Sequence, residues 1–152
     1  MNDRRMGRHP LLERLDVFIG EWTTVASFAP DDPVPAVFEW VLGGQFLMER
    51  SDSPDIPEAP DCISIVGLNP DGASYTQHYF DSRGVARLYA MTFQDGVWTL
   101  LRGAPDFTPL NFWQRFTGTF SADGRTVDGR WETSQDGETW ERDFDLTYRR
   151  VT

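Results

Sequence analysis

Lysine is absent from this sequence of 152 residues, which also contains only one cysteine and two histidines. The 14 basic side chains are all arginines, against 24 aspartates and glutamates, and the net charge is −10. A nucleic-acid ligand requires a basic surface that neutralises phosphates, so we expect no nucleic-acid partner. An anionic membrane surface is disfavoured for the same reason, so we expect no membrane partner either.

The scarcity of cysteine and histidine limits redox and metal chemistry. Cys62 has no second cysteine to pair with, so no disulfide forms within the chain, and a reducing compartment is expected. It lies in the apolar run 62–66, which is typical of a buried and inert thiol. One cysteine and two distant histidines cannot assemble a zinc site of the usual kind, so we expect no metal.

Long apolar runs and nucleotide-binding signatures are also missing. No run approaches the length of a membrane span, and the charged segment 1–8 lacks the apolar core of a secretory signal. We therefore expect a cytoplasmic protein. No P-loop, dinucleotide-binding glycine motif or serine elbow occurs, so no motif names a reaction.

A short apolar helix is predicted near the N-terminus, over residues 10–19. Pro10 suits its first turn, and Gly20 ends it. One face of this helix is apolar, and it consists of Leu11, Leu12, Leu15, Phe18 and Ile19. Such a helix can close one end of a β-barrel, with Trp22 of the following extended segment as the first side chain of the floor.

Strand-like runs and turn signals then alternate about every ten residues up to the C-terminus, a pattern typical of an all-β barrel. The predicted strands are residues 21–29, 35–42, 45–51, 62–68, 74–81, 85–94, 97–103, 111–120, 126–134 and 139–149. No linker, repeat or low-complexity tract divides them, so we expect a flexible N-terminus over residues 1–9 and a single β-barrel domain over residues 10–152. The predicted fold class is all-β: an antiparallel up-and-down barrel of about ten strands, closed at one end by the helix.

Two kinds of connection alternate between the predicted strands. Tight, glycine-containing turns occur at residues 43–44, 69–72, 95–96 and 121–124. The other connections are mostly longer and rich in proline, and they occur at residues 30–35, 52–61, 82–84, 103–110 and 135–138. Successive connections of an up-and-down meander lie at opposite ends of the barrel. The sequence therefore predicts a cup, with a floor beside the helix and a mouth rimmed by the longer loops.

Four segments resemble a known family. They are the Gly-x-Trp step within residues 18–22, the Gly-Gly turn within residues 38–47, and the closing segments 129–132 and 143–148. Together they resemble the DUF1579 family of the calycin superfamily, which includes lipocalins and fatty-acid-binding proteins, and whose nearest structural analogues are the ten-stranded nitrobindins. The resemblance implies a barrel that holds a ligand. Nitrobindins bind haem through a histidine on the late strands, but residues 140–149 contain none, so we expect no cofactor.

Alternation along the strands predicts which side chains face the barrel interior. Those expected inside include Trp140, Arg142, Phe144 and Tyr148 of the last strand, Trp131 of the strand before it, and Gln114 and Phe116 of strand 111–120. Trp113 is expected to face outward. In strands 74–81 and 85–94 the two faces are too alike for the pattern to choose between them.

Polar side chains near the mouth are the candidate ligand contacts. A buried arginine requires a carboxylate, water or an anionic ligand, and Glu39 is the acidic partner that the sequence suggests. The alternative is that the arginines extend to water at the rim. The predicted ligand-binding residues are Arg142, Gln114 and Arg50 as polar groups, with Phe28, Phe80, Trp140, Trp131 and Phe116 as apolar walls.

Three functions are compatible with such a cup. The first is binding of a small, mostly apolar molecule whose polar or anionic head meets the arginines. The second is a cyclase or isomerase that uses the same cavity, with His78 or Glu39 as acid or base; the alternatives are a structural histidine and a glutamate on the outer face. The third is a haem protein that handles nitrogen oxides, as nitrobindins do. A small-molecule ligand is the expected partner, and a homodimer is left open.

The floor carries a further expectation. Antiparallel pairing of the last strand with strand 21–29 places Arg150 beside Trp22, on the same face as Tyr148. Arg150 is therefore expected to lie over the Trp22 ring, in a cation–π contact worth about 0.5–2 kcal/mol. Calycins often place an arginine over this tryptophan, so the resemblance agrees with the pairing.

Overall fold

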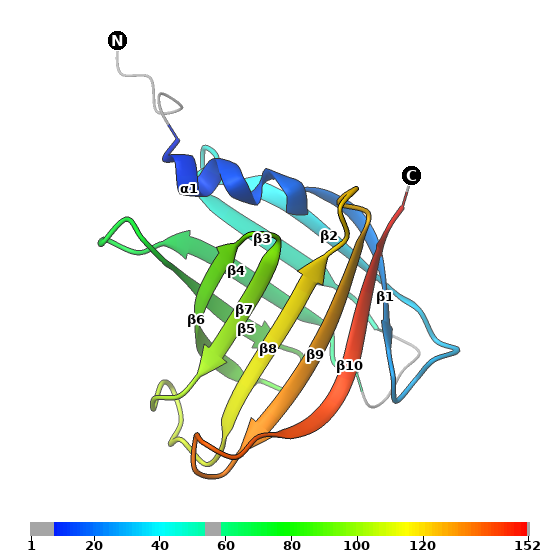
Figure 1. The fold of residues 1–152 in the computed structure, drawn as a ribbon, viewed down its shortest axis with the longest axis vertical. Coiled ribbons are helices and arrows are strands. Elements are labelled where there is room, and N and C mark those ends of the chain that lie inside the picture. Colours follow the sequence, from blue (N-terminus) through cyan, green and yellow to red (C-terminus); the bar gives the residue numbers. More distant parts are fainter. Residues whose placement is uncertain (1–7, 54–58, 152) are drawn as a thin grey trace.

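Ten antiparallel strands close into a barrel in the computed structural model, which describes residues 8–53 and 59–151 (Figure 1). Strands adjacent in the chain pair with each other, and β1 closes the barrel by pairing with β10. The predicted all-β barrel with a short N-terminal helix is confirmed. The strands are β1 Gly20–Ala26, β2 Val34–Val41, β3 Phe46–Ser51, β4 Cys62–Leu68, β5 Tyr75–Asp81, β6 Ala86–Gln94, β7 Val97–Arg102, β8 Trp113–Phe120, β9 Thr126–Ser134 and β10 Glu141–Arg150.

The strand bounds agree closely with those predicted, and β4 and β9 have the predicted limits. The largest difference is in β1, which ends at Ala26 because the Ala29 N–H donates to the Ala26 carbonyl oxygen and turns the chain there. Of the segment 1–9 that was predicted to be flexible, residues 1–7 lie outside the described residues. The helical segments within residues 8–53 and 59–151 do not have the length and hydrophobicity of a membrane span.

The N-terminal helix lies across one end of the barrel (Figure 1). It begins as α1, Pro10–Glu13, and tightens into the 3₁₀ turn η1, Arg14–Phe18. The His9 Nδ1 accepts a hydrogen bond from the Leu11 N–H at 3.0 Å and so caps the first turn. The side chains that the helix buries in the barrel end are Leu12, Leu15 and Phe18.

Trp22 is the centre of the barrel floor and is 1% exposed. Its Nε1–H donates to the Phe18 carbonyl oxygen at 2.8 Å, which ties η1 to β1. The Arg150 guanidinium lies 4.1 Å from the centroid of the Trp22 ring and donates to the carbonyl oxygens of Val17 and Ile19. The predicted cation–π contact is confirmed. The hydrogen bonds of the same guanidinium link β10 to the end of the helix.

Aromatic side chains fill the half of the barrel next to α1. The Phe18 ring lies at the centre of this cluster, with neighbouring ring centroids between 4.9 and 5.4 Å away, those of Phe38, Phe93, Trp98 and Phe120. Most of these pairs are edge-to-face, the arrangement that aromatic quadrupoles favour. The interior is packed here, and the space for a ligand lies in the other half.

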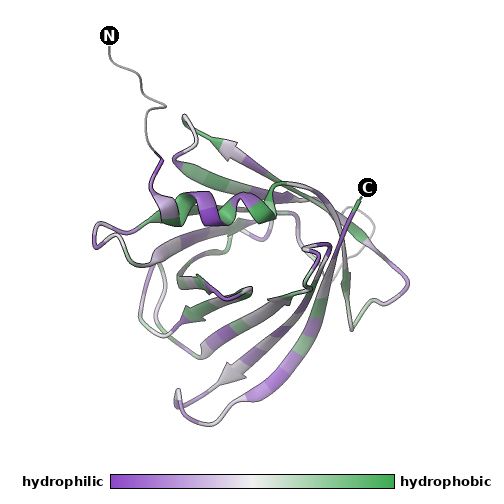
Figure 2. Ribbon diagram, turned by 45° about the horizontal axis from the view of Figure 1, so that its top comes forward, coloured by the Kyte–Doolittle hydropathy of each residue, from purple (hydrophilic) through white to green (hydrophobic). Residues whose placement is uncertain are grey.

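The tight turns lie at the α1 end of the barrel and the longer loops at the opposite end, as predicted (Figure 1). At the turn between β6 and β7, Asp95 and Gly96 have φ values of 55° and 76°, the left-handed pair that a two-residue hairpin needs. Hydrophobic and hydrophilic residues alternate along the strands (Figure 2). Because the helix and the tight turns close one end and the longer loops surround the other, the barrel has the shape of a cup with a packed floor.

A β-bulge near the start of β10 interrupts this alternation. Arg142 pairs with Glu132, whereas Phe144 pairs with Trp131, the adjacent residue of β9, so Asp143 is the extra residue. From Phe144 onward the predicted inward face is correct. Before the bulge the two faces are exchanged, because one extra residue reverses the side to which each side chain points.

Candidate ligand-binding cavity

A cavity of about 490 Å³ occupies the half of the barrel that faces the long loops. Its walls come from the strands, and its rim includes Phe28 and Asp32 of the β1–β2 loop, Pro60 before β4, and Phe112 before β8. The volume lies in the range of about 300–1,000 Å³ that is usual for small-molecule sites. The barrel thus provides a cavity of ligand size that opens at the mouth.

One side of the cavity, which we call the apolar wall, is formed by Leu100, Phe116, Trp131 and Leu146 on β7 to β10. The Phe116 and Trp131 ring centroids are 5.1 Å apart. Gly129 makes this packing feasible, because a Cβ at that position would lie 2.6 Å from the Phe116 ring and from the Leu146 carbonyl oxygen. The apolar wall suits a flat hydrophobic body.

The opposite side, which we call the polar wall, is formed by Glu49, Ser64 and Gln77 on β3, β4 and β5. These side chains are 8%, 3% and 4% exposed. Within the described part of the chain, neither Ser64 nor Gln77 makes a side-chain hydrogen bond. Buried polar groups are normally paired, so this wall offers donors and acceptors to a ligand or to water.

Glu49 is the ionisable group of the polar wall. Its Oε2 accepts a hydrogen bond from the Tyr148 hydroxyl of β10 at 2.9 Å. Burial raises the pKa of Glu49 to about 7, against the opposing effect of this hydrogen bond. Burial and the nearby Glu49 carboxyl raise the pKa of Tyr148 well above its usual value. The carboxyl therefore changes its charge near neutral pH while the phenol stays protonated.

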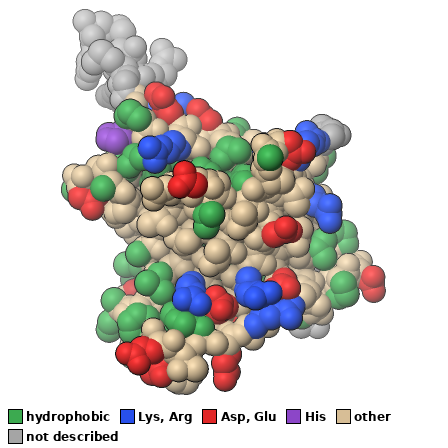
Figure 3. All heavy atoms as spheres, in the orientation of Figure 1, with side chains coloured by type: hydrophobic (Ala, Val, Ile, Leu, Met, Phe, Trp, Pro, Cys, Tyr) green, Lys and Arg blue, Asp and Glu red, His purple; other side chains and the backbone are tan. Residues whose placement is uncertain are grey.

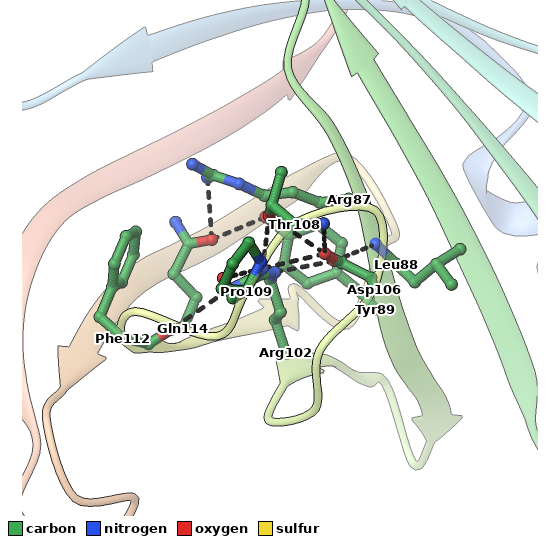
Figure 4. Close-up of polar contacts among 9 residues, drawn as sticks. All are labelled: Arg87, Leu88, Tyr89, Arg102, Asp106, Thr108, Pro109, Phe112 and Gln114. Carbon is green, nitrogen blue, oxygen red and sulfur yellow. Dashed lines mark hydrogen bonds and ion pairs between the residues drawn. The ribbon is translucent and has the colours of Figure 1, made fainter.

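A second polar group lies nearer the mouth, around Gln114 (Figure 4). The Gln114 Oε1 accepts hydrogen bonds from the Arg87 guanidinium at 3.0 Å and from the Tyr89 hydroxyl at 2.8 Å. The guanidinium also lies 5.6 Å from the centroid of the Phe112 ring. Among the described residues, no carboxylate forms an ion pair with Arg87. Arg87 thus brings positive charge, balanced by no adjacent carboxylate, to the cavity lining.

An ion pair holds the loop before β8 over the edge of the barrel (Figure 4). The Arg102 guanidinium binds both oxygens of Asp106 at 2.8 and 2.9 Å, with the two side chains 3% and 2% exposed. Asp106 also accepts hydrogen bonds from the N–H groups of Leu88 and Thr108. Arg102 holds the pKa of Asp106 far below its usual range. This ion pair, which we call the latch, also holds Phe112 at the rim, because the Arg102 Nη1 donates to the Phe112 carbonyl oxygen at 3.3 Å.

Four of the eight predicted ligand-binding residues line the cavity, and they are Gln114, Phe28, Trp131 and Phe116. Gln114 and Phe116 face inward as predicted, and Trp113 lies outside the cavity, against Gly103 and Gly137.

The prediction that Arg142 faces the cavity is wrong. Its guanidinium binds Asp145 at 2.7 Å on the outer surface, and its side chain is 53% exposed, because it precedes the bulge. Arginine and carboxylate side chains lie together on this outer face (Figure 3). Trp140 is also outside the cavity lining, with the Arg115 guanidinium 4.1 Å from its ring centroid. Arg50 is exposed, because its neighbour Glu49 takes the inward position on β3.

The candidate acid–base residues lie outside as well. Tyr75, Gln77 and Tyr79 form the inner face of β5, so His78 is exposed and Phe80, a predicted wall, is 40% exposed. Glu39 is exposed on β2 and does not pair with an arginine of the cavity. The other histidine, His9, caps α1, so neither histidine lines the cavity that would hold a haem.

The hydrophobic pattern of the sequence does not identify four of the polar cavity residues, which are Glu49, Ser64, Gln77 and Arg87. The available signal was strand pairing, since Glu49 lies opposite Phe38, a buried residue of β2. Taken alone, β3 gives the opposite indication, because Phe46 and Met48 share a face with Arg50. In the part of the chain that is described, no three His, Cys, Asp or Glu side chains are grouped so that they could hold a metal ion.

Comparison with known proteins supports the fold. No protein-family model matches the sequence, and no curated protein matches it. Among solved structures, the barrel is similar to that of Rv2717c from M. tuberculosis, with a TM-score of 0.60 over 94% of this chain and 98% of that chain. The two sequences are 13% identical over this match, so the similarity shows a shared ten-stranded antiparallel barrel and no more.

Proposed function

We propose that this chain binds a small, mostly apolar molecule with an anionic head, in the manner of calycins of the DUF1579 kind. The observation that carries the proposal is Arg87, a cation without a carboxylate partner among the described residues, at the edge of a cavity with an aromatic wall. Arg87 takes the role that the sequence assigned to Arg142.

The two halves of such a ligand would meet different parts of the cavity. The apolar body would lie against Phe116 and Trp131, where burial contributes about 25 cal/mol per Å² of apolar surface. The anionic head would accept hydrogen bonds from Arg87 and from the Gln114 amide nitrogen. Each charge-assisted hydrogen bond contributes about 1.5–3 kcal/mol.

The test uses two fluorescent probes that differ only in the anionic head. 8-Anilinonaphthalene-1-sulfonate carries a sulfonate, and N-phenyl-1-naphthylamine has the same aromatic body without it. Arg87→Met keeps the length of the apolar stem and removes the charge, so it should weaken the sulfonate probe by about tenfold or more. The neutral probe should bind the variant and the wild-type protein alike.

Arg142→Met is the matched control, since its guanidinium lies on the outer surface. It should leave the affinity of both probes unchanged. Equal losses of both probes in Arg87→Met would contradict the assignment of the head to Arg87. Failure of either probe to bind the wild-type protein would contradict the proposed function itself.

A further inference from the structure

The polar wall contains a carboxyl group with one free oxygen inside an aromatic cavity. Glu49 lines the cavity and is 8% exposed. Tyr148 occupies Oε2, and no other hydrogen bond to the carboxyl comes from the described residues. The hydroxyl of Tyr148 reaches Glu49 from β10, on the far side of β1 and β2, and holds the carboxyl group by its Oε2 atom. Oε1 is thereby left to a bound molecule.

We propose that Glu49 is a general base, which removes a proton from carbon in an apolar carbon acid held in this cavity, and that Tyr148 is its positioning residue. The inference rests on the proposed function, because the substrate must first occupy the ligand site. The substrate class is a flat, apolar molecule with a C–H bond next to a carbonyl or a similar electron-withdrawing group.

The proton transfer is balanced without any co-reactant. The Glu49 carboxylate takes the proton, and the electron pair of the C–H bond moves into the electron-withdrawing group, which becomes anionic. Return of the same proton to a second carbon gives an isomer and restores the carboxylate. Arg87 and the Gln114 amide are two donors of the cavity lining that would stabilise the anion.

The surroundings of Glu49 suit this role. A general base works best when its pKa is close to the working pH, and burial raises the pKa of Glu49 to about 7. β2 presents no ionisable group to the interior. The titratable groups that face Glu49 from the other elements are Cys62 of β4, Tyr79 of β5 and Tyr148 of β10. Burial raises the pKa of each of the three, so they are neutral near pH 7. The charged groups at the rim are Asp32, Arg83, Arg87 and Asp143.

The test uses 5-nitrobenzisoxazole, a flat carbon acid that reports proton removal directly. When a base takes its ring proton, the N–O bond breaks and a coloured cyanonitrophenolate forms, so no other reagent is consumed. The wild-type protein should accelerate this elimination by about 100-fold over Glu49→Gln, the usual contribution of a positioned base. The rate should rise with pH along a single titration curve with its midpoint at about 7.

Tyr148→Phe removes the hydrogen bond that lowers the pKa of Glu49, so the midpoint of the rate profile should move to higher pH. A purely structural tyrosine would change the rate without moving the midpoint. Glu49→Asp is the second variant, since it keeps the carboxylate and shortens its reach. It should lower kcat and leave the midpoint in the wild-type range. Glu39→Gln and His78→Gln, both on the outer face, should leave the rate unchanged.

Binding of N-phenyl-1-naphthylamine separates the two proposals. If the wild-type protein and Glu49→Gln both bind this probe but show equal elimination rates at every pH, the general base is refuted and the binding function stands. If neither protein binds the probe, the proposed function fails. A rate midpoint that is unchanged in Tyr148→Phe would overturn the positioning role of the tyrosine.

Discussion

Replacing Glu49 by glutamine should remove a loss of stability that the wild-type protein undergoes as the pH rises through the neutral range. The carboxyl has a pKa of about 7 in the folded protein, against a usual value of 4.5. Between these two values the folded state keeps the proton and the unfolded state releases it. The stabilisation from the protonated carboxyl is therefore fully present below about pH 4.5 and is lost as the pH rises through 7.

The shift in pKa corresponds to about 3 kcal/mol, and about 2–3 kcal/mol of this falls between about pH 5 and about pH 8.5. Glutamine keeps an oxygen that can accept the Tyr148 hydrogen bond and carries no charge at any pH. The free energy of unfolding of Glu49→Gln should therefore increase relative to that of the wild-type protein as the pH rises, by about 2–3 kcal/mol over that interval.

Urea unfolding of both proteins, followed by tryptophan fluorescence at several pH values, measures this difference. Comparison with the wild-type protein cancels the titration of the groups that both proteins share. Glu39→Gln is the matched control and should follow the wild-type curve, because Glu39 is exposed. Parallel curves for Glu49→Gln and the wild-type protein would refute the raised pKa and with it the burial of an ionisable carboxyl.

Three further changes probe the floor, the latch and the apolar wall. Arg150→Ala removes the cation–π contact and the hydrogen bonds to the helix carbonyls, and should lower the free energy of unfolding by about 2–4 kcal/mol without changing the affinity for N-phenyl-1-naphthylamine; an unchanged urea midpoint would contradict the contact. Arg102→Met leaves its carboxylate partner buried and unpaired, so stability should fall by about 3–5 kcal/mol and the Leu88 amide should lose protection from hydrogen exchange; retained protection would speak against the latch. Gly129→Ala places a methyl group 2.6 Å from the Phe116 ring and should push it into the cavity, so that the neutral probe binds at least about tenfold more weakly; wild-type affinity in this variant would show that the ring has room to retreat.

The sequence predicts the fold of this protein well because its turns are chemically distinct. Tight turns and long loops alternate without interruption, so strand number, connectivity and the two ends of the barrel follow from them. Arg150 was placed correctly over Trp22 because it lies on the same side of the β10 bulge as Tyr148. No register shift lies between Tyr148 and Arg150, so both side chains lie on the predicted face of β10.

The errors in the predicted site have one physical cause. In each case, the side chains of a strand point to the opposite face of the sheet from the one that was predicted. The bulge at Asp143 lies in a run of polar residues, so the change of face at Arg142 leaves no mark in the hydrophobic pattern. β5 has aromatic residues on both faces, since Tyr79 points inward and Phe80 outward. On β3 the inner face carries Glu49, which a pattern based on hydrophobicity assigns to the outside. In such strands, pairing with the adjacent strands decides which side chains face the interior, as it does for Glu49 opposite Phe38.

The three chemically different sides of the cavity have a stereochemical consequence. The apolar wall, the polar wall with Glu49, and Arg87 near the mouth do not repeat one another's chemistry. Under the proposed function, a ligand that carries an apolar body, an anionic head and one further polar substituent on a stereocentre would satisfy all three in one orientation. Its mirror image can satisfy any two and must leave the third contact unmade. If the proposed binding function holds, we expect the cavity to distinguish enantiomers, although most of its lining is apolar.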